Sequence, residues 1–517
     1  MERRIRRLGV FMVLCFIGLF LQLNNIQVLK ANSLATSPNN PRVIAVELSQ
    51  PRGDILSSDG VVLAKSVPAT SGPYKYQRVY PTNTAPLFSQ IVGYDTIFGT
   101  RTGVEAEYNN YLASHTSSPV TSSFISTLHN LLVSHTTTDN VTLTINSSLQ
   151  LQVATIMDKV YNPTTAPVEA AVVIDPKTGA IEAMYGNPTF NPNPLAATNA
   201  KAVTTAYNDL DPGSDQSPLV SRAFQFGFIP GSTFKTVTSA AVYDHNPALA
   251  KVDYPVAQCI TVPQRVQPLC NYQNGVGGSH EACGGMLVVT LPQSCDTAFA
   301  QLGLGLGPES LNAEAQAFGF NQNIPIDLPG AGVSAFPTAA ALLGNDPLQA
   351  TSAFGQGAGN DTVIATPLQM ALVAAGIANG GVIMTPHVME QIRDNQGNLV
   401  TSYTPKPWLT ATSQTTAAAV TSLMQKVVTS GTAAPGPGFS GFPASWNVAA
   451  KTGTAETGGG AQGNTLTNDW MIAFAPANDP KVAVAVAVPN QGFSATGAEV
   501  SGPPTKAILA AALGLTP

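Results

Sequence analysis

Five short apolar segments most constrain the fold, because they lie at the two ends of one long stretch of chain. EAAVVID and AIEAMYG flank a Pro-Lys-Thr-Gly turn at residues 176–179, a pattern typical of a β-hairpin. Further along, WNVAAKTGTAE, DWMIAFAP and KVAVAVAV predict three more strands, with a turn at residues 478–480 between the last two. We therefore expect an α/β domain of the α+β type. One central antiparallel five-stranded sheet is built from both ends, and a helical lobe is inserted between them.

The clearest helix in this lobe is TPLQMALVAAGIANGG. Thr366 is placed to cap it, Pro367 takes the first helical position, and two glycines end it. A last helix is expected from about Pro504 to Leu513. We assign residues 146–517 to this larger domain and residues 44–145 to a smaller N-terminal module.

The N-terminus is basic and then apolar. MERRIRR is followed by LGVFMVLCFIGLFLQL, a pattern shared by cleaved signal peptides and membrane anchors. The apolar run is long for a signal peptide, which favours an uncleaved anchor over residues 8–24. The positive-inside rule then places residues 1–7 in the cytoplasm and the rest outside the plasma membrane.

Four cysteines after the anchor lie close together: Cys259, Cys270, Cys283 and Cys295. In an exported chain they predict two disulfides, with three connectivities open. A metal site is the weaker interpretation, because no C-x-x-C spacing occurs and only His280 is near. The net charge of −6 argues against nucleic acid as a partner.

The stretch FIPGSTFKT carries a candidate nucleophile. Pro230-Gly231 interrupts the preceding structure, and a helix is expected to start at Ser232. Lys235 follows one helical turn later on the same face. A serine hydroxyl needs a base to become nucleophilic, and a lysine with a lowered pKa can be that base. The alternative interpretation of this Ser-x-x-Lys sequence is a serine that only caps the helix and a lysine that lies in solvent.

Two further motifs favour the catalytic interpretation. Ser294-Cys295-Asp296 and Lys451-Thr452-Gly453-Thr454 follow in the order S-x-x-K, S-x-[N/D], K-T-G, the signature of serine β-lactamases and penicillin-binding proteins. A second K-T-G at residues 177–179 lies in the predicted hairpin turn, so we assign no function to it.

The chain resembles the class B penicillin-binding protein transpeptidases, and among them the actinobacterial penicillin-binding protein A group. PLVSRAFQFGFIPGSTFK, FGQGAGNDTVIATPLQMALVAAGIANGGVIMTPH and TSGTAAPG are similar to stretches of these enzymes. PRGDILSSDGVVLA is similar to the opening of their non-catalytic pedestal, a dimerisation-like domain, although Ser57 and Ser58 replace the usual Asp-Arg. The resemblance covers roughly residues 45–512 and implies a serine β-lactamase/transpeptidase-like fold with a pedestal.

The resemblance implies a peptidoglycan D,D-transpeptidase that works through a serine acyl-enzyme without a cofactor or metal. Ser232 would attack the D-Ala-D-Ala bond, Lys235 would be the general base, and Ser294 would relay a proton to the leaving amine. The backbone N–H groups of Ser232 and Thr454 would form the oxyanion hole. The implied substrate-binding residues are Asp296, Lys451, Thr452, Gly453 and Thr454.

Implied partners are stem peptides, β-lactam antibiotics and a membrane glycan polymerase. A D,D-carboxypeptidase or a serine β-lactamase would share the motifs but deacylate with water, and a non-catalytic scaffold of division or elongation is a third class. The anchor and the pedestal argue against a lactamase. Asp296 replaces the commoner Asn. Its carboxylate only accepts hydrogen bonds and favours protonated lysines, which opposes Lys235 as a base.

Overall fold

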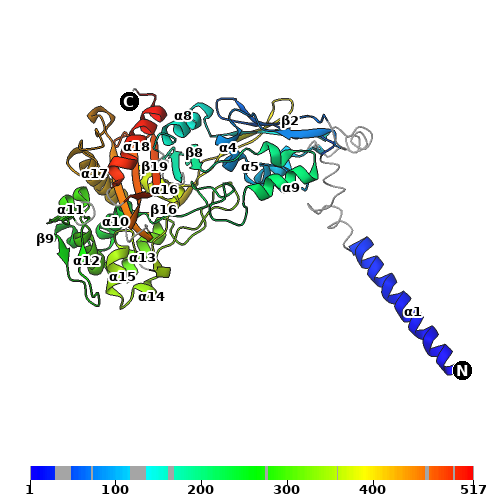
Figure 1. Ribbon diagram of the computed structural model, residues 1–517, viewed down its shortest axis with the longest axis horizontal. Helices are drawn as coiled ribbons and strands as arrows, with labels where there is room; N and C mark the ends of the chain where they lie inside the picture. The colour runs from blue at the N-terminus through cyan, green and yellow to red at the C-terminus, as the bar shows by residue number, and fades with distance from the viewer. Residues whose placement is uncertain are drawn as a thin grey trace.

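An isolated N-terminal helix projects from the body of the molecule in the computed structural model (Figure 1). The helix α1 (Glu2–Asn24) continues into a π-helical turn, and its apolar side chains are exposed. A candidate membrane span at residues 6–27 includes the predicted anchor. The predicted start of the N-terminal module at residue 44 lies outside the described residues. The structure describes residues 2–29, 48–70, 74–116, 136–160, 168–273, 278–357, 359–459, 465–492 and 495–515.

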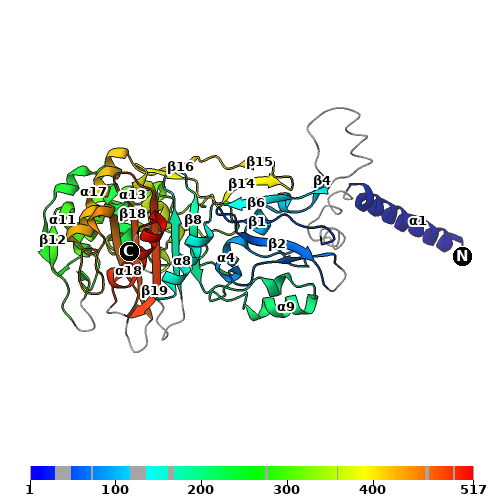
Figure 2. The same ribbon diagram turned by 90° about the horizontal axis from the view of Figure 1, so that it is seen from above.

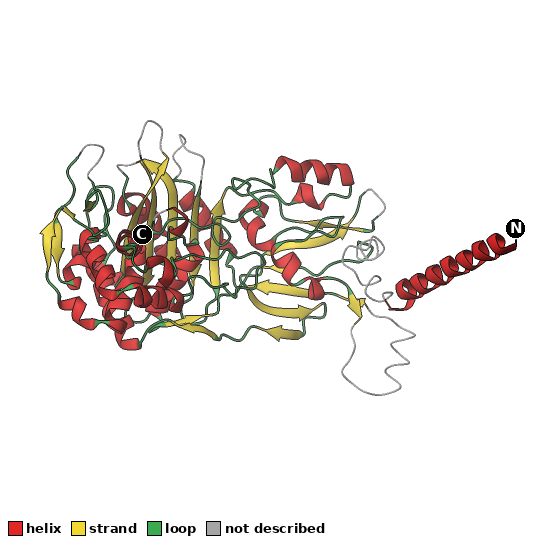
Figure 3. Ribbon diagram, turned by 90° about the horizontal axis from the view of Figure 1, so that it is seen from below, coloured by secondary structure: helices red, strands yellow, loops and turns green. Residues whose placement is uncertain are grey.

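The larger part of the molecule contains the predicted five-stranded antiparallel sheet, with helices on both sides of its strands (Figure 3). The strand order is β17-β18-β19-β7-β8, so strands from the two ends of the domain meet where β19 pairs with β7. The strands are β17 (Ala449–Gly459), β18 (Thr465–Ala475), β19 (Val482–Gly492), β7 (Glu169–Ile174) and β8 (Ile181–Asn187).

Both faces of this sheet are buried, which explains the continuous apolar runs in the sequence. Along β19, Val484 and Val486 belong to one buried cluster, and Ala483 and Ala485 belong to another. Successive side chains of a strand point to opposite faces, so a strand between two helical layers needs apolar residues at every position. The helices α18 (Gly497–Leu513) and α8 (Ser147–Met157) cover one face, and α16 (Pro367–Ala378) covers the other.

The helical lobe lies between β8 and β17 in the sequence. Its clearest predicted helix is confirmed as α16, where the Thr366 side chain accepts from the N–H of Gln369. The other α-helices of this stretch are α9 (Ala200–Asp209), α10 (Lys235–His245), α11 (Leu287–Gln293), α12 (Asp296–Leu306), α13 (Pro308–Ala317), α14 (Ala339–Leu342), α15 (Asp346–Ser352) and α17 (Gln414–Ser430). Short two-stranded ladders are β9 (Tyr254–Ala257) with β12 (Cys283–Gly285), β10 (Cys259–Ile260) with β11 (Leu269–Cys270), and β13 (Val382–Met384) with β16 (Pro407–Thr410).

The last helix begins earlier than the sequence predicted. It starts at Gly497, not near Pro504, because the Thr496 side chain caps it by accepting from the N–H of Glu499. Pro503 and Pro504 lie inside the helix. Proline is common in the first turn of a helix, and that preference placed the predicted start too late.

The N-terminal module is completed by strands from far along the chain. Its six-stranded sheet has the order β15-β14-β6-β1-β2-β3. Figure 2 shows β14 and β15 beside β6 and β1, although they follow residue 388 in the sequence. One sheet therefore spans the predicted boundary at residue 145. Its strands are β15 (Leu399–Ser402), β14 (Met389–Asp394), β6 (Asp139–Leu143), β1 (Ile55–Leu56), β2 (Val62–Pro68) and β3 (Tyr76–Val79), and its helices are α4 (Ala85–Val92), α5 (Gly103–Glu107) and α6 (Asn109–Leu112).

Buried charges hold this module together. The Glu105 carboxylate, which is fully buried, accepts from Arg52 at 2.9 Å and from Arg78 at 2.5 Å. Arg78 also donates to the Gly53 carbonyl at 2.8 Å, so the network fixes the chain just before β1. Removal of Glu105 would take away the carboxylate that pairs with both arginines, and breaking a buried ion pair in this way costs about 3–5 kcal/mol.

Candidate active site

Ser232 lies on a short 3-10 helix, Gly231–Phe234, that packs against β17. The close approach depends on Gly453, since a Cβ there would lie 2.8 Å from the Pro230 carbonyl oxygen. The indole N–H of Trp470 donates to the Ile229 carbonyl at 2.9 Å and fixes the same segment. The sequence predicted that a helix begins at Ser232. In the structure, the 3-10 turn comes first and α10 begins at Lys235.

Lys235 is fully buried and points at the Ser294-Cys295-Asp296 motif. Its amine donates to an Asp296 carboxylate oxygen and to the Ser294 carbonyl, both at 2.6 Å, and lies 3.3 Å from the Ser294 hydroxyl. Burial lowers the pKa of Lys235, and the Asp296 charge opposes part of this effect. A lysine with a lowered pKa can be neutral, and only the neutral form can accept a proton.

Ser294 is held in a strained backbone conformation. It follows the last residue of α11 with φ 59° and ψ 37°, the left-handed region that a residue with a Cβ adopts only at a cost. Its hydroxyl accepts from the Lys451 amine at 2.9 Å. The Ser294 hydroxyl therefore lies between the two motif lysines, where it can pass a proton.

Lys451 is as buried as Lys235. It lies on β17 opposite Ile472 and also donates to the Thr452 carbonyl at 2.9 Å. Burial holds the pKa of Lys451 well below its usual range, and the neighbouring positive charge of Lys235 lowers it further. An anion bound beside Lys451 would reverse this effect, because an opposite charge favours the protonated form.

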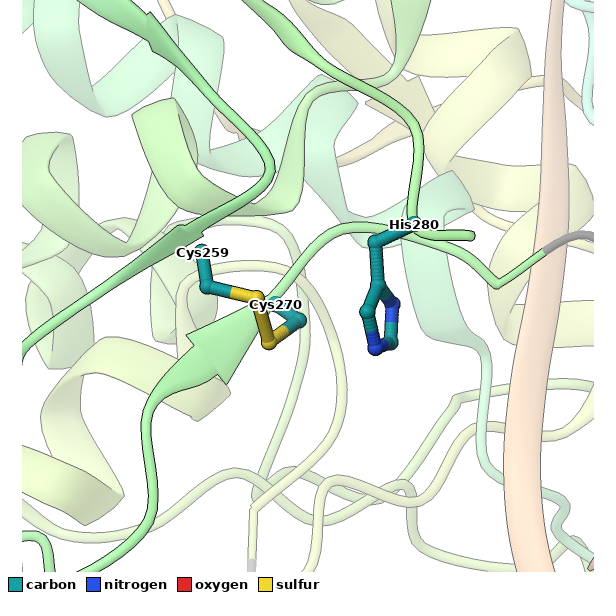
Figure 4. A group of neighbouring side chains, drawn as sticks. All are labelled: Cys259, Cys270 and His280. Carbon is teal, nitrogen blue, oxygen red and sulfur yellow. A yellow bond between two sulfur atoms is a disulfide. The ribbon is translucent and has the colours of Figure 1, made fainter. Parts of the chain in front are cut away.

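The four cysteines after the anchor form two disulfides, one of which adjoins Ser294. Cys283 pairs with Cys295 inside the second motif, and Cys259 pairs with Cys270 across the β10–β11 ladder. Figure 4 shows His280 beside the Cys259–Cys270 bridge. The two sulfur atoms and an imidazole nitrogen lie within 4.8 Å of one another. Because the sulfurs are bonded to each other, they do not offer the thiolates that a metal would need.

A cavity of about 750 Å³ brings most of the predicted residues together. Its walls include Ser232, Ser294, Asp296, Thr452 and Thr454, with the two lysines buried behind them. Other lining residues are Arg265, Tyr272, Glu281, Gln293, Thr351, Phe354, Gln356, Thr432, Phe439, Glu456, Thr496 and Glu499. The three predicted motifs, far apart in the sequence, thus form one site.

Thr432 is a lining residue that the sequence motifs did not single out. The Thr432 hydroxyl lies 2.6 Å from the Thr452 hydroxyl, and the Thr432 N–H donates to the Pro292 carbonyl at 3.0 Å. Thr432 thereby links the K-T-G strand to α11. It belongs to TSGTAAPG, so the signal was present, although no pattern of spacing marked this threonine. The other K-T-G lies outside the site, where Lys177 forms an exposed ion pair with Asp479 at 2.6 Å.

Comparison with known proteins identifies the family. The model of the penicillin binding protein transpeptidase domain matches residues 169–510, and that of the penicillin binding protein A dimerisation domain matches residues 52–137. The chain belongs to the penicillin-binding protein transpeptidases. It is 35% identical to the peptidoglycan D,D-transpeptidase PbpA of Mycolicibacterium smegmatis and 32% identical to that of Mycobacterium tuberculosis, with 99% of each chain covered in both cases.

Solved structures agree with this assignment. Penicillin-binding protein A from M. tuberculosis, solved as a ceftriaxone acyl-enzyme, superposes with a TM-score of 0.74 at 32% identity, covering 91% of this chain and 100% of that one. The predicted family, fold and enzyme class, a serine-type acyl-transfer enzyme, are confirmed.

Proposed function

We propose that this penicillin-binding protein is a D,D-transpeptidase that cross-links peptidoglycan stem peptides through an acyl-enzyme on Ser232. The observation that supports this most directly is the Ser294 hydroxyl between two buried lysine amines, at the wall of the cavity that Ser232 also lines. The full-length likeness to curated D,D-transpeptidases points to the same reaction.

In the acylation step, neutral Lys235 accepts the proton of Ser232 while the serine oxygen attacks the carbonyl carbon of the penultimate D-Ala. The backbone N–H groups of Ser232 and Thr454 stabilise the oxyanion, and one such donor contributes about 2.7–4 kcal/mol in a comparable enzyme. The C–N bond then breaks. Ser294 delivers a proton to the departing D-Ala amine, and Lys235 replaces it through their shared contact.

In the second step, the amine of another stem peptide attacks the acyl carbon. Its proton returns through Lys235 to the Ser232 oxygen as that bond breaks, and the cross-link is complete. A D,D-carboxypeptidase would use water in place of the amine. The two reactions differ only in the acceptor, so the product decides between them.

The substrate carboxylate is bound at β17. Lys451 supplies the positive charge, and Thr452 and Thr454 supply hydroxyl groups on the cavity side of the same strand. Gly453 contributes by allowing the Ser232 turn to approach the strand. A carboxylate arriving here stabilises the charged form of Lys451, so substrate binding and lysine protonation are coupled.

β-Lactams would be attacked at the same serine. M. tuberculosis penicillin-binding protein A has been solved as acyl-enzymes of ceftriaxone, imipenem and penicillin G. We expect this chain to be acylated at Ser232 by the same chemistry. The α1 helix would anchor it as a single-pass protein with the catalytic domain outside the cytoplasm, and a membrane glycan polymerase would be its partner.

The experiment has two parts. The full-length protein is labelled with a fluorescent penicillin, and the adduct is located by mass spectrometry; we expect it on Ser232 and expect none in Ser232→Ala. The enzyme is then given a donor stem peptide and an amine acceptor. A cross-linked product supports the transpeptidase, hydrolysis alone indicates a carboxypeptidase, and absence of both label and product would overturn catalysis.

A further inference from the structure

A buried carboxyl stands directly behind the substrate-binding threonine. Asp469 on β18 pairs with Thr454 on β17 in the antiparallel ladder, so their side chains lie on the same face of the sheet. Asp469 is fully buried. The K-T-G signature contains no residue at this place, and Asp469 takes no part in the proposed acyl transfer.

Hydrogen bonding restricts the orientations that the Thr454 hydroxyl can take. The hydroxyl oxygen accepts from the Gly497 N–H at 2.9 Å. The start of α18 lies close against β17 here, since a Cβ at Gly497 would lie 2.2 Å from the Gly453 carbonyl oxygen. One lone pair of the Thr454 oxygen is thus used. The second lone pair and the single hydroxyl proton remain to be shared between Asp469 and the cavity.

One carboxylate oxygen of Asp469 is available for an interaction with Thr454. The Thr467 hydroxyl donates to Oδ2 at 3.2 Å, and the buried Oδ1 has no short hydrogen bond among the described residues. The Ser501 hydroxyl donates to the Asp469 backbone carbonyl at 2.8 Å, which fixes the residue in place. An ionised Oδ1 can only accept a proton from Thr454, whereas a protonated carboxyl can donate to it.

We propose that Asp469 is a positioning residue whose protonated carboxyl donates to Thr454 and thereby turns the Thr454 hydroxyl proton toward the substrate carboxylate. This inference depends on the proposed function, because it assumes that Thr454 binds the carboxylate. When Asp469 loses its proton, the Thr454 proton turns back to it. The cavity then faces a lone pair, which repels an anion.

The surroundings of Asp469 permit this change near neutral pH. Burial raises the pKa of Asp469 to about 7, against the lowering effect of the Thr467 hydrogen bond and of the nearby Thr454 hydroxyl, and the Glu499 charge raises it further. The groups that face it are Thr454 and Glu456 from β17, Thr467 from its own strand, Glu499 and Ser501 from α18, Val488 from β19 and Tyr272 across the cavity. No cation of the described residues contributes to the pKa of this carboxyl.

The test is the pH dependence of acylation of the full-length enzyme by benzylpenicillin, compared with its methyl ester, which lacks the carboxylate. With the parent enzyme, the affinity for benzylpenicillin should fall about tenfold between about pH 7 and 8.5. The limiting acylation rate at saturating benzylpenicillin is measured separately, because its pH dependence is set by the general base and not by Asp469. Asp469→Asn should remove this loss, because its amide donates at every pH. The ester should show no difference between parent and variant.

Glu499→Gln is the matched control. It removes a nearby charge but no donor to Thr454, so the loss of affinity should remain and begin at lower pH, since the pKa of Asp469 falls without Glu499. Identical benzylpenicillin profiles for Asp469→Asn and the parent would overturn the proposal, as would an equal change with the ester. If the parent is never acylated at Ser232, the proposed function itself fails; acylation with unchanged profiles removes only the role of Asp469.

Discussion

The amine of Lys235 lies 2.6 Å from the Asp296 carboxylate, in an ion pair whose lysine is fully buried. The general base of the proposed mechanism is therefore held by a group that favours its protonated form. Burial and the ion pair act in opposite directions on the pKa of Lys235, and burial is the larger effect.

Replacement of Asp296 by Asn should accelerate acylation at low pH. Without the negative charge the pKa of Lys235 falls further, so the neutral base is populated at lower pH. The rising limb of the acylation rate against pH should move to lower pH, and the rate near pH 6 should increase severalfold. Stopped-flow acylation by penicillin measures this, and an unmoved limb would contradict the assigned base.

Lys235→Met should keep the fold and lose most of the reactivity. General-base catalysis contributes about 10²–10⁴-fold, so acylation should slow by that range. Ser232→Ala should abolish it. If Lys235→Met were acylated at the parent rate while remaining folded by circular dichroism, another group would be the base.

The two copies of K-T-G should respond differently to the same change. Lys451→Ala should weaken penicillin binding and acylation by more than about tenfold, because it removes a buried cation at the carboxylate site. Lys177→Ala should leave acylation unchanged, since its ion pair with Asp479 is exposed. Acylation rates of the two variants check this, and equal losses would show that the hairpin copy affects the site.

The two disulfides offer a matched pair of variants. They close loops of similar length, with sequence separations of 11 and 12, so loss of either should destabilise the protein by a similar amount, about 3 kcal/mol. Only the Cys283→Ser/Cys295→Ser variant should also slow acylation, because that bridge adjoins Ser294 on the strained turn. Thermal melts and acylation rates separate the two effects. Equal acylation by both variants would remove the support role of the Cys283–Cys295 bridge.

Gly497→Ala should disturb the active site from behind. The added Cβ would lie 2.2 Å from the Gly453 carbonyl oxygen and 2.6 Å from that of Trp470, so α18 must move away from β17. We expect a loss of stability of about 1–3 kcal/mol and a weaker affinity for penicillin. Gly213→Ala, at an exposed position where the added Cβ meets nothing within 4 Å, is the control for the added methyl group. Unaltered affinity in a folded Gly497→Ala would show that the contact is dispensable.

The sequence predicted those parts of the structure that carry a local pattern. The five strands of the catalytic sheet were found because burial on both faces makes each an apolar run. The β14–β15 hairpin was not found. MEQIRD and LVTS are partly exposed, and β14 pairs with β6 from a distant part of the chain, so neither periodicity nor neighbours revealed the contact.

For the active site, too, the sequence predicted only the residues that belong to a local pattern. Its motif residues were recognisable because the chemistry requires fixed spacings, as with Ser232 and Lys235. Thr432 and Asp469 act through contacts across the fold, with Thr452 and Thr454 respectively. Such contacts depend on strand register and on how helices pack, and a linear pattern does not contain them.

The strands β14 and β15 lie late in the sequence, and this position affects how the protein folds during synthesis. In a chain made from its N-terminus, residues 52–143 are synthesised long before residues 389–402, which complete the same sheet. Until then one edge of β6 is unpaired and open to mispairing with other chains. The pedestal sheet can therefore be completed only after most of the catalytic domain has been synthesised, which couples the folding of the two units.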